Sequence, residues 1–338
     1  MDKHWNPVHD MPDMIGKVVV VTGGNSGIGL HTVKHFVSKG AKVYFTARSE
    51  AKAQYTRQLV MSAAPQALSE NLIWVSIDLS NVESVLQGAS FIKSKEKKVD
   101  ILVNNAGQLT RDLQTNDAGW EMVMAVCHVG HFVLTNALIP LLSAAAAEKD
   151  ADVRVVTLSS NVVGIFLPHD YPFDFKSRGF LYGDTPYAPW KFRYLQRHFF
   201  TVDMLRYSLA KAANMMFARE LQRRFDERGL NIISVSLHPG GVKSDAALAI
   251  FAEFMKPIMR HIMVSEDEGS FTTLFAATSK TVLFTARYKG RYMEPIGQVM
   301  PSHPVTEDEE QVRGLWNNTA AEVAKYVEEH NCGVLEDW

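Results

Sequence analysis

Cysteines, long apolar runs and a leader segment are scarce or missing in this chain of 338 residues. The two cysteines, Cys127 and Cys332, have no paired spacing, so the sequence indicates neither a disulfide framework nor a zinc site. No run of about 18 apolar residues is present, which argues against a membrane-spanning helix. The first 16 residues are polar and lack the apolar core of a signal peptide. We therefore expect a cytoplasmic protein without an integral membrane segment.

Net charge is also small, because 35 Lys and Arg face 37 Asp and Glu and leave a formal charge of −2. This balance gives no electrostatic case for binding nucleic acid or an anionic membrane. A hydrophobic content of 46% and a charged content of 21% are typical of a globular protein that buries a large core. The sequence contains no evident repeat, low-complexity linker or second domain, so we expect a single domain over residues 1–338.

The most informative stretch is residues 18–29, which read VVVVTGGNSGIG. Its four valines predict a strand buried on both faces, and a glycine turn and a helical pattern follow. Together they predict the first half of a dinucleotide-binding βαβ unit. Glycine is needed there because a side chain would hold the backbone away from a pyrophosphate, which the free N–H groups of the helix N-terminus attract. The spacing Gly23-x3-Gly27-x-Gly29 differs from the commonest fingerprint, and an ordinary glycine-rich turn is the alternative.

The second predicted strand, residues 42–47, ends where this architecture meets the adenosine ribose. An acidic residue there favours NAD, whereas arginine suits the 2′-phosphate of NADP. The chain has Arg48 at this point and no acid before Glu50. We therefore favour NADP(H), with NAD(H) as the alternative. A solvated charge at a helix start is the other interpretation of Arg48.

Further strands are predicted at residues 71–77, 100–104, 153–158, 231–238 and 291–294. Asp78 follows the first of these, and we expect it either to cap the next helix or to receive the adenine amino group. The second runs into Asn-Asn-Ala-Gly at residues 104–107. Strands that alternate with helical patterns predict an α/β fold with a doubly wound parallel sheet.

These motifs resemble those of the short-chain dehydrogenase/reductase (SDR) family over about residues 15–300. The family's motifs match, in order, Thr22-Gly23-x3-Gly27-x-Gly29, the Asn-Asn-Ala-Gly at 104–107, Tyr207-x3-Lys211 and Pro239-Gly240. The resemblance implies a Rossmann fold and an oxidoreductase that uses a nicotinamide cofactor. Within the family, residues 127–135 and 288–295 are most similar to the retinol-dehydrogenase-like branch.

The resemblance also implies the catalytic residues Ser160, Tyr207 and Lys211. Ser160 follows a predicted strand, and its hydroxyl can stabilise the oxyanion that develops when a carbonyl accepts hydride. Tyr207 and Lys211 are four residues apart on a predicted helix and share a face. Because the ordinary pKa of tyrosine is near 10, we expect the lysine charge to lower the pKa of Tyr207 and the lysine to hold the nicotinamide ribose. A chance pair on a helix is the alternative.

The expected cofactor site combines these motifs with the ends of neighbouring strands, and no metal is expected. Its residues are Gly23, Asn25, Ser26, Gly27, Ile28, Gly29, Arg48, Asp78, Leu79, Asn105, Ala106, Gly107, Tyr207, Lys211, Pro239, Gly240, Val242 and Ser244.

One position departs from the family. The family usually places an asparagine, which links the catalytic lysine to solvent through a water, on the helix predicted here at 115–142; this chain has Cys127. A thiol is a poor hydrogen-bond partner, so either other groups carry the proton or Cys127 is an inert core residue, which we favour. His128 and His131 lack an evident third metal ligand, so we expect them to pack or to form hydrogen bonds.

Three segments surround this core. Residues 163–206 are rich in aromatic residues and proline and far longer than the family needs, so we interpret them as a lid over a bulky apolar substrate; a surface subdomain or dimer contact is the alternative. Residues 246–264 predict one methionine-rich helix that closes the pocket, packs in the core or touches a membrane. A helix is predicted at 265–279, and residues 303–338 form a helical extension.

The predicted function is interconversion of a secondary alcohol and a ketone on a terpenoid-, steroid- or aryl-like molecule, as in secondary metabolism. A homodimer is a further expectation. Two alternatives remain: a protein with this fold that senses the cofactor or acts as a scaffold without turnover, and an epimerase or dehydratase of nucleotide sugars. The second is disfavoured because that branch resembles Thr-Gly-x-x-Gly-x-x-Gly instead.

Overall fold

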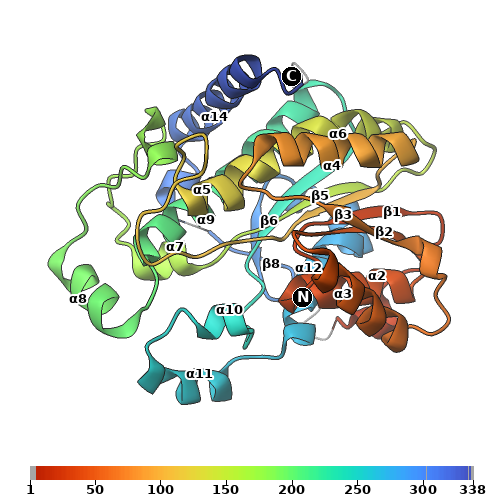
Figure 1. The fold of residues 1–338 in the computed structure, drawn as a ribbon, viewed down its shortest axis with the longest axis horizontal. Coiled ribbons are helices and arrows are strands. Elements are labelled where there is room, and N and C mark those ends of the chain that lie inside the picture. The colour runs from red at the N-terminus through yellow and green to blue at the C-terminus, as the bar shows by residue number, and fades with distance from the viewer. Residues whose placement is uncertain (1–4, 302, 334, 336–338) are drawn as a thin grey trace.

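The computed structural model describes residues 5–301, 303–333 and 335 and is built on an eight-stranded sheet. Figure 1 shows the sheet at the centre of the fold. Its strand order is β3-β2-β1-β4-β5-β6-β7-β8. The neighbours from β3 to β7 are parallel, and β8 is antiparallel to β7. The strands are β1 Val18–Val21, β2 Lys42–Ala47, β3 Leu72–Ser76, β4 Ile101–Asn104, β5 Val153–Leu158, β6 Ile232–Leu237, β7 Tyr292–Glu294 and β8 Gln298–Val299. The predicted doubly wound α/β fold is confirmed.

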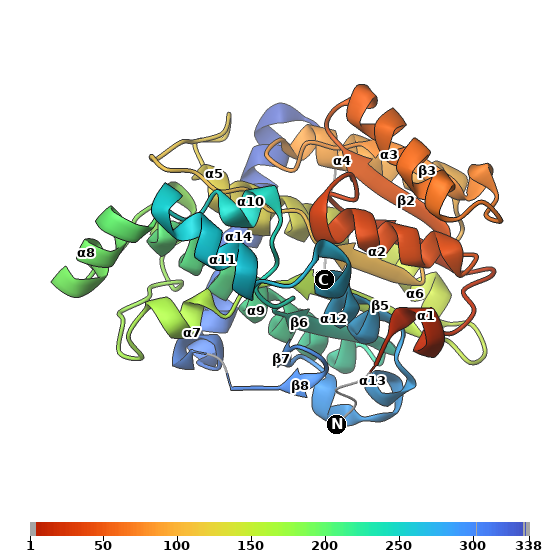
Figure 2. The same cartoon turned by 90° about the horizontal axis from the view of Figure 1, so that it is seen from below.

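Helices cover both faces of the sheet (Figures 1 and 2). One hydrophobic cluster joins the sheet to α4, α6, α9 and α14, and the other joins it to α2, α3 and α12. The helices are α1 Pro7–Asp10, α2 Gly27–Ser38, α3 Glu50–Ala63, α4 Val82–Lys95, α5 Met122–Met124, α6 Gly130–Ala146, α7 Val162–Phe166, α8 Trp190–Phe199, α9 Met204–Glu227, α10 Asp245–Leu248, α11 Lys256–Ile262, α12 Glu266–Thr278, α13 Lys280–Phe284 and α14 Glu309–His330. Short 3₁₀ turns lie at Ser69–Asn71, Arg178–Tyr182, Glu253–Met255, Ala286–Tyr288 and Pro304–Thr306.

The long helix predicted at 115–142 begins later, at Met122, so that prediction is wrong at its start. The Asn116 side chain accepts a hydrogen bond from the Trp120 amide, and Gly119 has φ +77°, so residues 116–120 form a turn. From Met122 the chain is helical to Ala146, with a π-helical segment at Ala125–Val129 that carries Cys127. This stretch is long and apolar enough to cross a membrane, but 89% of its most apolar window is buried inside the fold.

The first part of the 163–206 segment packs against the C-terminal helix. Phe173, Phe175 and Phe180 are buried in the larger hydrophobic cluster together with Trp316 of α14. Backbone groups of Phe175 hydrogen-bond to the side chains of Gln311 and Asn318 on that helix. The second part is different, because α8 contains no buried residue and protrudes at one end of the molecule (Figure 1). The first part of this segment therefore belongs to the hydrophobic core, and the part that contains α8 lies on the surface.

The single helix predicted at 246–264 is also wrong. The structure has α10, the 3₁₀ turn Glu253–Met255 and α11, which are separate elements. Between them, Phe251 pairs with Phe200 as an isolated β-bridge, and the Ala252 amide donates to the Phe199 carbonyl oxygen. This pairing with a remote segment takes residues 251 and 252 out of the helical pattern. The helix predicted at 265–279 is confirmed as α12, with the Ser265–Glu268 capping box at its start.

Candidate active site

The fold brings Ser160, Tyr207 and Lys211 together at the carboxyl ends of the parallel strands. Ser160 lies two residues beyond β5, at the carboxyl end of that strand. Tyr207 and Lys211 lie in the first two turns of α9, whose start is fixed by Asp203, because its carboxylate accepts from the Leu205 and Arg206 amides. A catalytic helix that begins at this end of the sheet presents its first turns beside the strand end, where ligands of open α/β sheets bind.

Lys211 is held against the end of β5 by several hydrogen bonds. Its Nζ donates to the Leu158 carbonyl oxygen at 3.1 Å, and the Asn214 amide donates to the same oxygen at 2.9 Å. The Ser159 hydroxyl in turn donates to the Lys211 carbonyl oxygen at 2.6 Å. The ammonium group lies 5.6 Å from the centre of the Tyr207 ring. The sequence analysis did not predict a role for Asn214. The feature that could have indicated it is its position one helical turn after Lys211.

The Ser160 side chain influences the Tyr207 phenol and favours its ionised form. Burial raises the pKa of Tyr207 above its ordinary value, and the Lys211 charge opposes that rise. The predicted direction of the lysine effect is therefore right. The predicted outcome, a lowered pKa of Tyr207, is wrong for the protein alone because burial is the larger influence. The phenol is consequently kept in its protonated form.

Cys127 lies beside this group and is buried. Its Sγ donates a weak hydrogen bond to the Gln108 carbonyl oxygen at 3.7 Å, and burial raises the pKa of the thiol. A neutral buried thiol agrees with the interpretation of Cys127 as an inert core residue.

Both neighbouring histidines are buried and hydrogen-bonded, as predicted. His131 Nε2 lies 2.8 Å from the Thr22 hydroxyl, and His128 Nε2 lies 3.0 Å from the Thr319 hydroxyl of α14. Burial lowers the pKa of His128 to about 3 and of His131 to about 4. No group of three potential metal ligands occurs among the described residues.

The turn after β1 contains glycines at positions where the backbone conformation or tight packing leaves no place for a side chain. Gly23 and Gly27 have φ of +63° and +54°, which glycine adopts without strain. A Cβ at Gly29 would overlap the Gly23 carbonyl oxygen. The Ser26 side chain makes no capping bond to α2, so the first N–H groups of this 12-residue helix have no side-chain cap.

Thr22 ties this turn to the Asn-Asn-Ala-Gly segment. The Thr22 hydroxyl accepts from the amides of Asn105 and Ala106 at 2.9 and 3.0 Å, and the Asn105 side chain donates to the Thr22 carbonyl oxygen at 2.7 Å. Gly107 extends the same segment toward α9, because a Cβ placed there would lie 3.9 Å from Lys211 Nζ. The two motifs therefore meet as predicted. Thr22, which was not among the expected cofactor-site residues, is the residue that joins them.

The adenosine end of the expected site contains Arg48, Asp78 and Leu79. Arg48 is exposed directly after β2. The Asp78 carboxylate accepts from the amide and hydroxyl of Ser80, while Asn81 caps α4. The capping alternative for Asp78 is therefore wrong. Leu79 is buried in contact with α6, where a Cβ at Gly130 would overlap the Leu79 carbonyl oxygen.

The segment after β6 completes the expected site. Gly240 has φ +95°, Val242 is buried against Gly269 of α12, and Ser244 caps α10. A Cβ at Gly27 would lie 3.8 Å from both Ser244 Cβ and Glu266 Oε1, so this segment and the start of α12 lie beside the glycine turn. Of the expected residues, Asn25 and Ile28 lie in this same turn and at the start of α2.

Comparisons with known proteins decide the family. A family model described as short chain dehydrogenase matches residues 17–169. The short chain dehydrogenase/reductase dpchH of Colletotrichum higginsianum is 39% identical over 95% of this chain and 78% of its own length. The protein belongs to the short-chain dehydrogenase/reductase family. It is therefore an NAD(P)-dependent oxidoreductase by family; the retinol-dehydrogenase-like branch stays a prediction.

Other relatives of this SDR protein agree. The short chain dehydrogenase/reductase dpfgH of Gibberella zeae is 40% identical over 93% of this chain and 84% of its own. Among solved structures, the NADPH-bound carbonyl reductase from chicken fatty liver has a TM-score of 0.61 at 24% identity and covers 85% of this chain and 99% of its own. At this identity the structural likeness shows the Rossmann fold alone.

The residues of this SDR protein fit a dinucleotide. Gly29 lets the turn pack tightly, because a Cβ there would overlap the Gly23 carbonyl oxygen, and the uncapped start of α2 supplies N–H donors for a pyrophosphate. Lys211 has a buried ammonium group at the carboxyl end of β5 that can donate to ribose hydroxyls. Glu266 is a contrary feature, because its carboxylate lies beside the turn and would repel a pyrophosphate.

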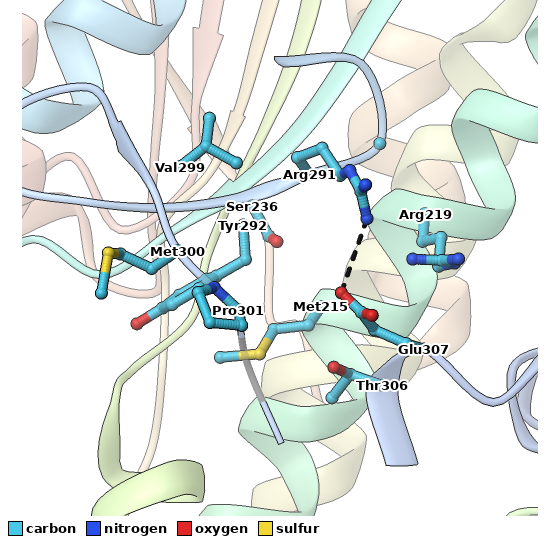
Figure 3. Close-up of a pocket in the computed structure, with 11 residues that line it drawn as sticks. Met215, Arg219, Ser236, Arg291, Tyr292, Val299, Met300, Pro301, Thr306 and Glu307 are labelled. Carbon is cyan, nitrogen blue, oxygen red and sulfur yellow. Dashed lines mark hydrogen bonds and ion pairs between the residues drawn. The ribbon is translucent and has the colours of Figure 1, made fainter. Parts of the chain in front are cut away.

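A separate cavity of about 250 Å³ lies between α9 and β7. Arg291 and Glu307 form an ion pair at 3.5 Å on its wall, and Figure 3 shows this pair together with Met215 and Arg219 of α9. None of the expected site residues, all of which are described, lines this cavity. It is therefore distinct from the candidate active site.

Proposed function

We propose that this SDR enzyme interconverts a secondary alcohol and a ketone with NADP(H), using Tyr207 as acid–base, Ser160 as hydrogen-bond donor to the reacting oxygen and Lys211 as the cation that assists Tyr207. The observation that carries the proposal is the Lys211 ammonium group, held at the end of β5 and 5.6 Å from the Tyr207 ring, with Ser160 among the side chains that influence the Tyr207 phenol. In the proposed arrangement a proton donor, a hydroxyl and a cation surround one point at the carboxyl ends of the strands.

In the reductive direction, the Tyr207 phenol gives its proton to the carbonyl oxygen of the ketone while the Ser160 hydroxyl donates a hydrogen bond to it. The glycine turn and Lys211 would hold a nicotinamide cofactor, which when bound would supply the hydride that the carbonyl carbon needs. The raised pKa of Tyr207 supports this direction, because a protonated phenol is the form that donates. In the oxidative direction the phenolate is required, and the Lys211 charge favours it.

The preference for NADP(H) rests on Arg48. Its side chain is exposed at the end of β2 and forms no hydrogen bond or ion pair with any other described residue, so it is available to a 2′-phosphate. The nearest acid, Glu50, accepts a hydrogen bond from Gln54 within α3. Two similar structures, the chicken carbonyl reductase and the L-sorbose reductase from Gluconobacter frateurii, contain NADPH.

The substrate is proposed to be bulky and apolar, of the terpenoid, steroid or aryl kind. The support is the aromatic residues of α8 and the apolar residues of α11, which flank the chain leading into Tyr207. The lid role of residues 163–206, a place in secondary metabolism, the cytoplasmic location and the homodimer stay predictions.

The test is turnover followed by the absorbance of reduced nicotinamide with a panel of cyclic and aryl ketones. Tyr207→Phe is expected to lower kcat at least about 100-fold, the range of a lost general acid, while NADPH binding is retained. The matched control Tyr187→Phe, at an exposed tyrosine, should retain near-complete activity. A fully active Tyr207→Phe variant would refute the assignment.

The alternative is a cofactor-binding protein without turnover, and Cys127 is the residue that favours it. In that case NADPH binds, no ketone or alcohol of the panel reacts, and Cys127→Asn restores activity only if the missing relay group is the cause.

A further inference from the structure

Two neighbouring segments expose large apolar side chains on one end of the molecule. We call residues 187–200 and 254–264 the α8–α11 platform. Trp190 is 73% exposed, Phe254 64% and Ile262 65%. The other exposed large apolar residues of the platform are Tyr187, Tyr194, Leu195, Ile258 and Val264. Scattered single apolar residues are normal on a surface, but a contiguous group of this kind marks an interaction site.

The two segments form one surface because they are joined side by side. Phe199 and Phe254 have ring centres 5.8 Å apart, and Phe200 and Phe251 have ring centres 5.9 Å apart. The Ala252 amide donates to the Phe199 carbonyl oxygen at 2.9 Å. Figure 2 shows α11 beside α8, both at the same end of the molecule.

The exposed side chains of α8 are not core residues, because a different face of the helix makes the inward contacts. Phe192 packs edge-on against Phe166 at 5.8 Å, and Gln196 hydrogen-bonds to the backbone of residues 202 and 204. Trp190, Arg193 and Arg197 lie on the opposite face at helical spacing and are exposed. The solvent-facing side of α8 therefore carries both aromatic and basic residues, whereas an ordinary amphipathic helix directs its aromatic residues to the core.

Charge on the platform contrasts with the rest of the chain. Its two segments contain five Lys or Arg residues, two His and no Asp or Glu, whereas the whole chain has a net charge of −2. The basic residues are Lys191, Arg193, Arg197, Lys256 and Arg260. Glu253, just outside the platform, pairs with Lys256 at 2.5 Å, which leaves the other four cations without an acidic partner inside it.

We propose that the α8–α11 platform docks on the surface of a bilayer that contains anionic phospholipid. Trp and Tyr rings are suited to the boundary between headgroups and acyl chains, Phe and Ile enter the apolar layer, and Lys and Arg pair with anionic headgroups. Charge complementarity favours this occupant over a second copy of the chain, since two identical basic surfaces repel each other. The net charge of the protein conceals this local positive surface.

Docking there has a consequence for the substrate, and this part rests on the proposed function. Residues 200–204 connect the platform directly to α9, whose second turn carries Tyr207, and α10 connects it to Ser244. A platform seated on lipid therefore brings the candidate active site next to the layer in which a bulky apolar alcohol or ketone is dissolved.

The experiment is co-sedimentation of the full-length protein with vesicles, without substrate or cofactor. We expect binding to phosphatidylcholine vesicles with about 30% phosphatidylserine, and little binding to phosphatidylcholine alone. Binding should fall when salt is raised from about 0.1 M to about 1 M, because the screening length shortens from about 10 Å to about 3 Å. Equal binding to both vesicle types, or to neither, overturns the proposal.

Trp190 supplies an internal probe, because it alone is exposed among the tryptophans that the structure describes. Anionic vesicles should shift its fluorescence to shorter wavelength, and lipids brominated on the acyl chain should quench it. Trp190→Phe should remove both signals while binding is retained. Vesicle binding without either signal would show that the platform is not the contact, which overturns the proposal.

Matched variants locate the surface. Ile262→Ser should weaken vesicle binding about tenfold through lost apolar burial, and Arg193→Gln and Arg197→Gln about fivefold each. The controls are Phe284→Ser, at a side chain 78% exposed on α13, and Lys52→Gln on α3. Unchanged melting temperatures establish folding. Equal losses in controls and platform variants overturn the proposal, as does a platform-dependent dimer seen by light scattering without lipid binding. The vesicle experiment measures no turnover, so its outcome can be interpreted even if the proposed function is wrong.

Discussion

Removing the indole of Trp316 should detach the C-terminal helix from the core. Trp316 is 4% exposed; its ring stacks on Phe217 at 5.8 Å and meets Phe132 edge-on at 4.9 Å. The Arg224 guanidinium lies 4.3 Å over its face. A buried Trp replaced by Ala costs about 3–5 kcal/mol, and each aromatic pair is worth about 0.5–1.5 kcal/mol beyond its buried area. We therefore expect Trp316→Ala to lose about 4–5 kcal/mol of unfolding free energy.

Urea unfolding followed by far-ultraviolet circular dichroism measures this loss as the shift in midpoint multiplied by the denaturant slope. The matched control is Trp190→Ala, which removes the same side chain at an exposed position and should cost less than about 0.5 kcal/mol. A loss below about 1 kcal/mol in Trp316→Ala would refute the reasoning, since no packed tryptophan can be removed so cheaply.

Three further predictions concern charge. Arg48→Ser should raise KM for NADPH about tenfold or more, the worth of a charge-assisted hydrogen bond, with KM for NADH nearly unchanged; equal effects in initial-rate assays would contradict the NADP(H) preference. Glu266→Gln should tighten NADPH binding about fivefold in a fluorescence titration, because unit charges 4 Å apart in water repel by about 1 kcal/mol, whereas Glu268→Gln in the same helical turn should leave it unchanged. The pKa of His128 is lowered by burial from 6.5 to about 3, so the unfolded chain binds more protons between these values and stability falls as pH falls through this window. His128→Leu should flatten that dependence by up to about 1.4 kcal/mol per pH unit, and an unchanged slope in urea midpoints would contradict the assigned burial.

Local sequence determines the strands that are buried on both faces. The valines at 18–21 and the spans 42–47 and 153–158 were predicted with the bounds that the structure has, because short segments rich in β-branched and aromatic residues favour strands. The meeting of Ser160 with Tyr207 and Lys211 was expected from the family resemblance, because it depends on the packing of α9 against the end of β5.

Where the prediction failed, remote parts of the chain decide the structure. The helix predicted at 246–264 is interrupted because Phe251 pairs with Phe200, which periodicity within one segment cannot reveal. The pKa of Tyr207 is raised rather than lowered because burial by the folded chain exceeds the effect of its helical neighbour Lys211. The bonds of Ser159 and Asn214 to α9 and β5 likewise depend on tertiary contact.

The position of α14 imposes an order on synthesis. Its residues, Glu309–His330, follow every strand of the sheet in the chain and so leave the ribosome after them, yet they cover Phe132 of α6 and Phe217 of α9. Until then the growing chain has a nearly complete sheet with an uncovered apolar seam, and such a seam is prone to aggregate. The contact between His128 and Thr319 also links residues that are 191 positions apart, so it forms only after a long search. Docking of α14, rather than formation of the sheet, is therefore the step that ends the exposure of this apolar seam.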